Sequence, residues 1–151
     1  MKTVLKYVTV LFLAQACRAV QNILNFGAIP DSDTMAAEQT NAQAFMDALV
    51  AANYTTDREV LVPAGHNFNM FAVWGRYVNN ITITIDGNIT ASKRYRHWPL
   101  KEEYDEKNIT SQVVRDFIDI EYTTDVLVRG KGTVDGNGFM WWVREYLVQN
   151  H

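Results

Sequence analysis

The chain has 151 residues, 48% hydrophobic and 21% charged, and its formal net charge is −3. This composition is that of one ordinary globular domain, and it supplies no basic field that would favour a nucleic-acid partner. Three histidines and one cysteine also argue against a structural zinc site.

The N-terminus shows the order of features of a secretory signal peptide. Positive charge, a short apolar run and small residues follow one another, at Lys2 and Lys6, residues 8–14, and Ala16 and Ala19. We expect a signal peptide over residues 1–19, cut after Ala16 or Ala19, and a secreted, extracellular product formed by residues 20–151. The run is shorter than the ~20 residues of a membrane span, so no membrane association is expected after cleavage. The alternative is a buried N-terminal strand.

Four Asn-x-Thr sequons agree with export, because such sequons are glycosylated in secreted proteins. The glycosylation candidates are Asn53, Asn80, Asn88 and Asn108. An alternative stays open for Asn80 and Asn88, since both flank an expected strand and their threonines are good strand formers.

The first regular element after the signal peptide is an amphipathic helix. Its apolar stripe recurs at helical spacing, at Ala42, Phe45, Met46, Leu49 and Val50. Thr40 and Gln43 have the spacing of a capping box, which predicts a helix over residues 40–52 with Thr40 as its N-cap. One helix ahead of many short strands suits a cap over the open end of a solenoid.

Short apolar strands separated by glycine turns follow the helix. The strand ends at Val62 and Ile85 are 85 − 62 = 23 residues apart, and the Ile85-Asp86-Gly87-Asn88 and Val134-Asp135-Gly136-Asn137 units are 134 − 85 = 49 apart. Steps near 23 residues lie within the ~20–45 residues of solenoid repeats. The spacing therefore predicts stacked coils, with the two Asp-Gly units about two coils apart.

A rival topology uses Asp86-Gly87 as the tip of a two-residue hairpin that joins residues 81–85 to residues 88–91. That pairing would indicate an antiparallel sandwich. A charged, aromatic stretch over residues 93–107 has no clear period and is interpreted as an excursion from the coil. Residues 139–146 are expected to form a helical turn.

The carboxylate pair with the best spacing for joint acid–base chemistry is Asp119 and Glu121. On one face of a strand they would lie roughly 6–7 Å apart, and an inverting glycosidase needs two carboxyl groups roughly 6.5–9.5 Å apart. A solvated outer face of a coil is the simpler interpretation, because any alternating strand produces such a pair.

Other side chains could bind a ligand, and each has a structural alternative. Asp135 could be called catalytic, but an aspartate in an Asp-Gly turn more often accepts hydrogen bonds from its own turn. Trp141 and Trp142 could stack on sugar rings, although at least one is expected to pack over the coil. The basic residues of the excursion could attract an acidic polysaccharide or form solvated surface; they are Lys93, Arg94 and Arg96.

Taken in order, four sequence blocks resemble the N-terminal portion of the polygalacturonase-like glycoside hydrolases of the pectin-lyase-like superfamily. The blocks are Phe26-Gly27-Ala28 with Asp31 and Asp33, Val60-Leu61-Val62-Pro63-Ala64-Gly65, residues 83–89 with Ala91-Ser92 and Trp98-Pro99, and residues 130–138 with Trp141-Trp142. The resemblance implies an all-β right-handed parallel β-helix, a solenoid that is incomplete here, with an N-terminal capping helix. It also implies hydrolysis of α-1,4 galacturonate links in pectin, an acidic polysaccharide partner, no cofactor, and a monomer if the chain is complete.

The family's catalytic motifs are Asn-Thr-Asp, Asp-Asp, Gly-His-Gly and Arg-Ile-Lys, and none of them occurs in this sequence. Thr123-Thr124-Asp125 and Gly65-His66-Asn67 differ from them in residues and in place. No catalytic residue is therefore carried over to this chain. We expect a truncated, inactive portion that aggregates through unpaired strand edges. The alternative is a non-catalytic polysaccharide-binding or structural β-helix module.

Overall fold

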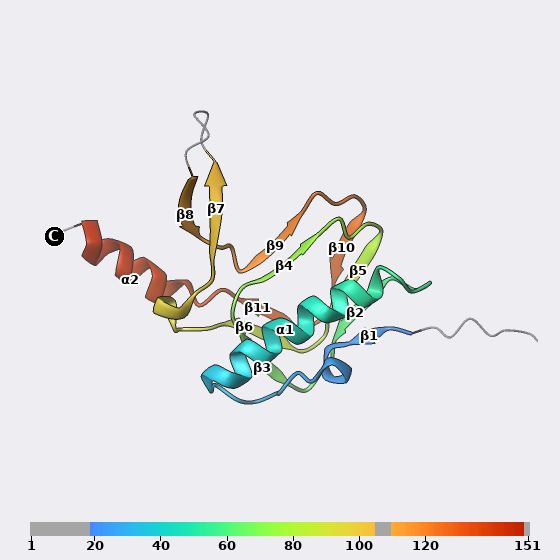
Figure 1. The fold of residues 1–151 in the computed structure, drawn as a ribbon. Helices are drawn as coiled ribbons and strands as arrows, with labels where there is room; N and C mark the ends of the chain where they lie inside the picture. Colours follow the sequence, from blue (N-terminus) through green and yellow to red (C-terminus); the bar gives the residue numbers. More distant parts are fainter. Residues whose placement is uncertain (1–18, 105–109, 150–151) are drawn as a thin grey trace, which may run out of the picture.

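The computed structural model describes residues 19–104 and 110–149, and these residues form mainly short strands in parallel sheets (Figure 1). The first sheet has the order β1-β2-β5-β10, with β1 at Gln21–Asn22, β2 at Glu59–Val62, β5 at Ile81–Ile85 and β10 at Val126–Arg129. The second has the order β11-β6-β3, with β3 at Asn67–Met70, β6 at Asn88–Ala91 and β11 at Thr133–Asp135. The third pairs β4, Val73–Arg76, with β9, Ile118–Glu121.

Successive strands visit the three sheets in turn. The chain passes through β2, β3 and β4, then through β5, β6 and β9, and then through β10 and β11, and every pair within these sheets is parallel. The expected all-β class is confirmed, and parallel sheets with few helices are consistent with a β-helix-like fold.

The hairpin alternative for Asp86-Gly87 is wrong. β5 pairs in parallel with β2 and β10, whereas β6 pairs with β3 and β11, so the two strands lie in different sheets. Parallel neighbours require a crossover and cannot be joined by a two-residue turn.

The core is built from inward-facing residues of neighbouring strands. Val60, Ile83 and Val128 share one register position across the first sheet, and Phe68, Ile89 and Val134 share one across the second. Val60, Ile83, Phe68 and Ile89 are buried, while Val128 and Val134, on the last strands, are 58% and 48% exposed. Among the described residues, no strand covers the outer edges of β10 and β11. Aggregation through these edges stays a prediction.

The expected distance of two coils between the Asp-Gly units is wrong. Ile85 in the first sheet is level with Gly130, because β5 and β10 are offset by 126 − 81 = 45 residues and are direct neighbours. The Asp135-Gly136 turn follows β11 in the second sheet and is not the counterpart of Asp86-Gly87. One turn of the chain therefore takes 45 residues here, and the 23-residue step from β2 to β5 is confirmed.

The extra length comes from the excursion. It contains the short 3-10 helix η2, Tyr95–His97, and an antiparallel hairpin of β7, Leu100–Tyr104, and β8, Thr110–Val114. This hairpin stands away from the three parallel sheets in Figure 1. The expected excursion is confirmed in the described part, and it continues beyond residue 107 to the end of β8.

Helix α1, Met35–Ala52, begins five residues earlier than expected, 40 − 35 = 5. Its N-cap is Thr34, whose Oγ1 accepts a hydrogen bond from the Ala37 N–H at 3.2 Å. Thr40 is an interior position, so the capping-box prediction is wrong. The helix packs beside β3, β4 and the short 3-10 helix η1, Ile23–Phe26, and buries Phe45 and Leu49 completely or nearly so.

A pair of threonine variants tests this cap. Thr34→Ala is expected to lower the free energy of unfolding by about 1 kcal/mol, because the Ala37 N–H loses its acceptor. Thr40→Ala should change it by less than about 0.5 kcal/mol. Urea unfolding followed by circular dichroism measures both, and equal losses in the two variants would contradict the cap.

A hydrogen-bonded column on the outer face of the first sheet joins three strands. Thr84 Oγ1 donates to Glu59 Oε1 at 2.5 Å, and Arg129 donates to the same Glu59 oxygen through Nη2 and to Thr84 Oγ1 through Nε, both at 3.1 Å. The Thr84 hydroxyl, and secondarily Arg129, holds the pKa of Glu59 below its usual value.

The column predicts a pH dependence of stability. Because the folded pKa of Glu59 is lowered, its contribution is present above the unfolded pKa of about 4.5 and is lost as the pH falls through the folded pKa. Glu59→Gln should cost about 1 kcal/mol at pH 7. The free energies of unfolding of the variant and the wild type, measured by urea unfolding, should become equal when the pH falls below the folded pKa of Glu59. A difference that stays constant from pH 7 to the acid limit would speak against this role.

The described chain ends in helix α2, Gly138–Gln149, which is longer than the helical turn expected over residues 139–146. Among the residues that the structure describes, no helix is long and apolar enough to cross a membrane.

Candidate polysaccharide-binding cleft

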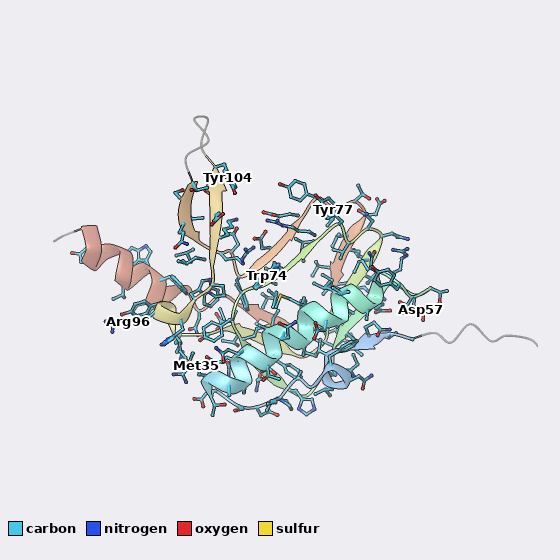
Figure 2. All side chains as sticks on the ribbon, in the orientation of Figure 1. Met35, Asp57, Trp74, Tyr77, Arg96 and Tyr104 are labelled. Atoms are coloured by element: carbon cyan, nitrogen blue, oxygen red, sulfur yellow. The ribbon has the colours of Figure 1, made fainter. Side chains whose placement is uncertain are left out.

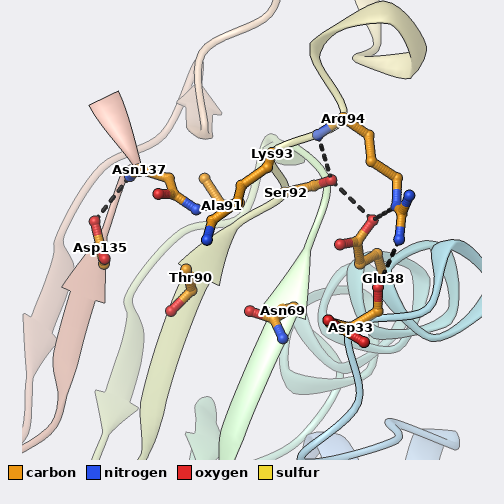
Figure 3. Close-up of a pocket in the computed structure, with 10 residues that line it drawn as sticks. All are labelled: Asp33, Glu38, Asn69, Thr90, Ala91, Ser92, Lys93, Arg94, Asp135 and Asn137. Carbon is orange, nitrogen blue, oxygen red and sulfur yellow. Dashed lines mark hydrogen bonds and ion pairs between the residues drawn. The ribbon is translucent and has the colours of Figure 1, made fainter. Parts of the chain in front are cut away.

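A polar cleft of about 530 Å³ lies where the N-terminal part of α1 faces the ends of β3, β6 and β11 (Figure 3). Ten residues line it: Asp33, Glu38, Asn69, Thr90, Ala91, Ser92, Lys93, Arg94, Asp135 and Asn137. Three of them, Lys93, Arg94 and Asp135, are singled out from the sequence, the first two as binding candidates and Asp135 as a catalytic candidate, and the fold brings them together.

The floor of the cleft is a row of outward-facing side chains on the second sheet. Asn69, Thr90 and Asp135 share one register position on β3, β6 and β11. They point outward because their neighbours in the strands, such as Phe68 and Ile89, fill the core. An amide, a hydroxyl and a carboxylate are thus lined up at the spacing of neighbouring strands, about 4.8 Å.

One wall is an ion pair between Glu38 on α1 and Arg94 in the segment after β6, in which the Glu38 carboxylate is buried. Glu38 Oε2 accepts from Ser92 Oγ at 2.8 Å and from Arg94 Nε at 3.0 Å, and Arg94 Nη2 donates to the Asp33 carbonyl at 2.7 Å (Figure 3). The Glu38 side chain is only 5% exposed. Arg94 is therefore engaged in holding the wall, and it is not a free cation for an anionic ligand.

Lys93 is the cation that the cleft leaves available. Its side chain is exposed and lies across the opening in Figure 3, and it makes no hydrogen bond or ion pair with any described residue. The ammonium can meet an anionic group, while the amides, hydroxyls and carboxylates of the floor can exchange hydrogen bonds with hydroxyl groups. This donor and acceptor set fits a hydroxyl-rich, acidic ligand.

The prediction for Asp135 is confirmed. Its Oδ1 accepts a hydrogen bond from the Asn137 N–H at 2.8 Å, within its own turn. Asn137 Nδ2 in turn donates to the Ala91 carbonyl at 2.9 Å, which ties this turn to the neighbouring strand β6.

The solvated outer face predicted for Asp119 and Glu121 is wrong for Asp119. Asp119 is 7% exposed and accepts a hydrogen bond from Arg115 Nη1 at 2.9 Å, and Lys101 Nζ is 3.8 Å away. Glu121 pairs with Arg76, whose Nε is 3.0 Å from its Oε2. Both carboxylates therefore have cationic partners. Arg76 comes from the neighbouring strand β4, Lys101 comes from the hairpin, and Arg115 stands four residues before Asp119 in the segment after β8.

The remaining aromatic and basic candidates lie in different environments, and none of them lines the cleft. Trp141 is half-buried against the core, 5.1 Å from the ring of Trp98, whereas Trp142 is 73% exposed, so one tryptophan packs over the coil as predicted. Arg96 lies on the outer side of η2, over the ring of Tyr95 (Figure 2), and does not line the cleft.

The segment Gly65-His66-Asn67 forms a surface contact with Asp31 at the turn before α1. Asp31 Oδ1 accepts from the Asn67 N–H at 3.0 Å, and His66 Nδ1 is 3.1 Å from Asp31 Oδ2. The Asn67 N–H, and then His66, lowers the pKa of Asp31 from its usual value. This contact joins the turn to β3, and none of its residues lines the cleft.

The glycosylation candidates stay predictions. Asn80 is exposed at a turn with φ 54°, and Asn53 ends α1 with its Oδ1 accepting from Arg58 Nη1 at 3.1 Å. Asn88 is exposed but donates from Nδ2 to Asn67 Oδ1 at 2.7 Å. Asn108 and the signal-peptide residues 1–18 lie outside the described residues.

Sequence reasoning missed Glu38 and Ser92. Glu38 precedes the expected start of the helix, so its place on the buried face of α1 was not visible. The signal that could have found it is Thr34, an N-cap residue type four positions earlier. In the two described ranges, no group of three or more His, Cys, Asp or Glu side chains is placed to hold a metal ion.

The parallel sheets are consistent with a β-helix-like fold, and the polar cleft lies beside their strand ends. A family model, glycosyl hydrolases family 28, matches residues 53–148, which is more than half of the 151 residues. The chain belongs to this family, the polygalacturonase family, and the resemblance noted from the sequence blocks is confirmed. Comparison with curated proteins and with solved structures gave no match.

Proposed function

We propose that this chain forms the first coils of a right-handed parallel β-helix, capped by α1, in a secreted polygalacturonase-type glycosidase. Its substrate would be a pectin-like polysaccharide with α-1,4 galacturonate links. The observation that carries the proposal is the family match over residues 53–148, which spans the strands from β2 to β11. The parallel register of β2, β5 and β10 supports the coiled arrangement.

We further propose that the 151-residue chain binds this polysaccharide without hydrolysing it. An inverting glycosidase needs one protonated and one ionised carboxyl with room for a water between them. Glu38, Asp119 and Glu121 are each held by an arginine. The cleft nevertheless offers Lys93 and a row of hydrogen-bonding groups, and this favours the second candidate, a non-catalytic binding module.

A purified-chain experiment tests both statements. With polygalacturonate, reducing ends should not rise above the buffer value, while native electrophoresis in a polygalacturonate gel should retard the chain. Lys93→Ala should weaken the retardation about threefold to tenfold, because the free ammonium of the cleft is lost. Lys131→Ala, an exposed lysine outside the cleft, is the matched control.

Release of reducing ends by the pure chain would refute the absence of hydrolysis, and a chain that the gel does not retard would refute the polysaccharide-binding role. The transcript downstream of the His151 codon separates the two candidates. In-frame Asn-Thr-Asp and Asp-Asp motifs would favour the enzyme, and their absence would favour the module.

A further inference from the structure

A groove between α1 and β4 is separate from the cleft described above. It consists of two adjoining cavities, of about 380 Å³ and 180 Å³, which share Gln43, Met46 and Trp74 as lining residues. In Figure 2 Trp74 lies between β4 and α1. No residue that lines either cavity also lines the cleft, so the two places can bind different ligands.

One wall of the groove is a face of α1. Five helical residues line it at a spacing of three or four residues, which places them on one side of the helix: Gln39, Gln43, Met46, Asp47 and Val50. From the first to the last, 50 − 39 = 11 residues at 1.5 Å each give a length of ~16 Å. All of them except Met46 are exposed. A ligand can therefore reach this wall along its whole length.

Trp74 on β4 forms the middle of the opposite wall. It lines both cavities and is 37% exposed. The Arg115 guanidinium carbon lies 4.6 Å from the centre of its ring, and Arg115 lines neither cavity. The ring is therefore held by a cation on one face, and it presents to the groove a surface that Arg115 does not cover. An indole fixed in this way offers flat apolar area at little further cost in conformational entropy.

Exposed polar groups stand on both walls. On the α1 wall, Asp47 Oδ1 accepts a hydrogen bond from Gln43 Nε2 at 2.8 Å. The second Asp47 carboxylate oxygen and the Gln43 carbonyl oxygen accept none from any described residue. On the β4 wall, the Arg76 side chain is 54% exposed and its Nη2 lies 3.0 Å from Glu121 Oε2. Two acceptors and a guanidinium beside an aromatic ring suit a ring that carries hydroxyl groups.

The charge of the groove disfavours an acidic ligand. Arg76 is neutralised by Glu121, whereas no described residue forms an ion pair with Asp47. The carboxylate of a uronate would lie beside the Asp47 carboxylate and be repelled by it. A neutral sugar avoids this repulsion, and its hydroxyl groups can donate charge-assisted hydrogen bonds to Asp47.

We propose that the groove between α1 and β4 binds a neutral oligosaccharide, with the apolar face of one sugar ring on Trp74 and its hydroxyl groups donating to Asp47 and Gln43. The inference goes beyond the proposed function, because it concerns a neutral ligand and residues outside the cleft. The chain then has two saccharide sites, one for an acidic ligand beside Lys93 and one for a neutral ligand beside Trp74.

Calorimetric titration of the purified chain with cellotetraose, a neutral β-1,4-linked oligosaccharide, tests this site. Trp74→Ala should weaken binding about tenfold or more, because the sugar loses the flat apolar surface. Asp47→Ala should weaken it about threefold to tenfold, because a hydroxyl group loses its charged acceptor. The matched controls are Trp142→Ala and Glu102→Ala. Both replace an exposed side chain of the same kind outside the groove, and both should bind like the wild type.

A competition experiment tests the preference for a neutral ligand. The wild type should bind cellotetraose with the same affinity in the presence of excess tetragalacturonate, because the groove does not take the acidic sugar. Competition between the two ligands would overturn the inference. The absence of cellotetraose binding would also overturn it, and so would an unchanged affinity in both Trp74→Ala and Asp47→Ala.

Urea unfolding verifies that each variant is folded. Asp47 is exposed on α1, so Asp47→Ala keeps the test decisive even if Trp74→Ala, which removes the ring under Arg115, does not fold. A wild-type chain that the polygalacturonate gel retards but that does not bind cellotetraose refutes only the groove. A wild-type chain that binds cellotetraose but that the gel does not retard refutes only the proposed function.

Discussion

Phe68→Ala is expected to lower the free energy of unfolding by about 4 kcal/mol. Phe68 is fully buried on β3, level with Ile89 on β6, and its ring fills the space between the second sheet and the rest of the core. Removal of the ring forfeits its transfer free energy and leaves a cavity that neighbours held in parallel register cannot close. Urea unfolding monitored by circular dichroism provides the measurement.

The matched control is Phe139→Ala. Phe139 is 74% exposed on α2, so the same change of side chain should alter the free energy of unfolding by less than about 0.5 kcal/mol. Similar losses of unfolding free energy at the two positions would show that Phe68 is not a core residue and that the side chains at its register position do not face the core.

Gly87→Ala should cost about 3 kcal/mol. A Cβ at Gly87 would lie 2.2 Å from the Pro63 carbonyl oxygen and 3.0 Å from that of His66, both on the backbone of the preceding turn. The Gly87 N–H donates to the Val62 carbonyl at 3.1 Å, so the two turns are in direct contact. The added methyl group would force these turns apart and weaken the strand pairing on either side.

Gly136→Ala is the control for this change, because it removes the same backbone freedom from the unfolded chain. A Cβ at Gly136 meets no atom within 4 Å, so the variant should be as stable as the wild type or slightly more stable. If both variants unfold at the same urea concentration, the close stacking at Gly87 is refuted.

The helix shows where local sequence patterns stop being informative. The stripe through Phe45 and Leu49 predicted the helix and its buried face, because burial of apolar side chains follows the helical period. The pattern could not choose between Thr34 and Thr40 as N-cap, since both are suitable residue types. The N-cap is the residue at which the helix starts, and the start of α1 is set by its packing against β3 and β4. In the structure the Ala37 N–H at this start donates to Thr34 Oγ1.

The repeat shows the same limit at longer range. The 23-residue step between β2 and β5 was predictable because the chain between these neighbouring parallel strands carries no insertion. The chain between the neighbouring strands β5 and β10 carries the β7–β8 hairpin and takes 45 residues, so two Asp-Gly units of similar sequence occupy different places in the sheets. The distance between two similar motifs in the sequence therefore gives the length of one repeat only when the length of any inserted segment is known.

The sequence by itself determined the all-β class, the family and the alternation that separates core from surface, because these depend on local periodicity and on ordered motifs. Only the tertiary structure decided which polar side chains meet. Glu38 and Ser92, 54 residues apart, share a hydrogen bond, and Glu121 on β9 pairs with Arg76, 45 residues earlier on the neighbouring strand β4. The physical reason is that stacking in parallel sheets joins residues from distant segments, and the charges of those neighbours are not visible in any single strand.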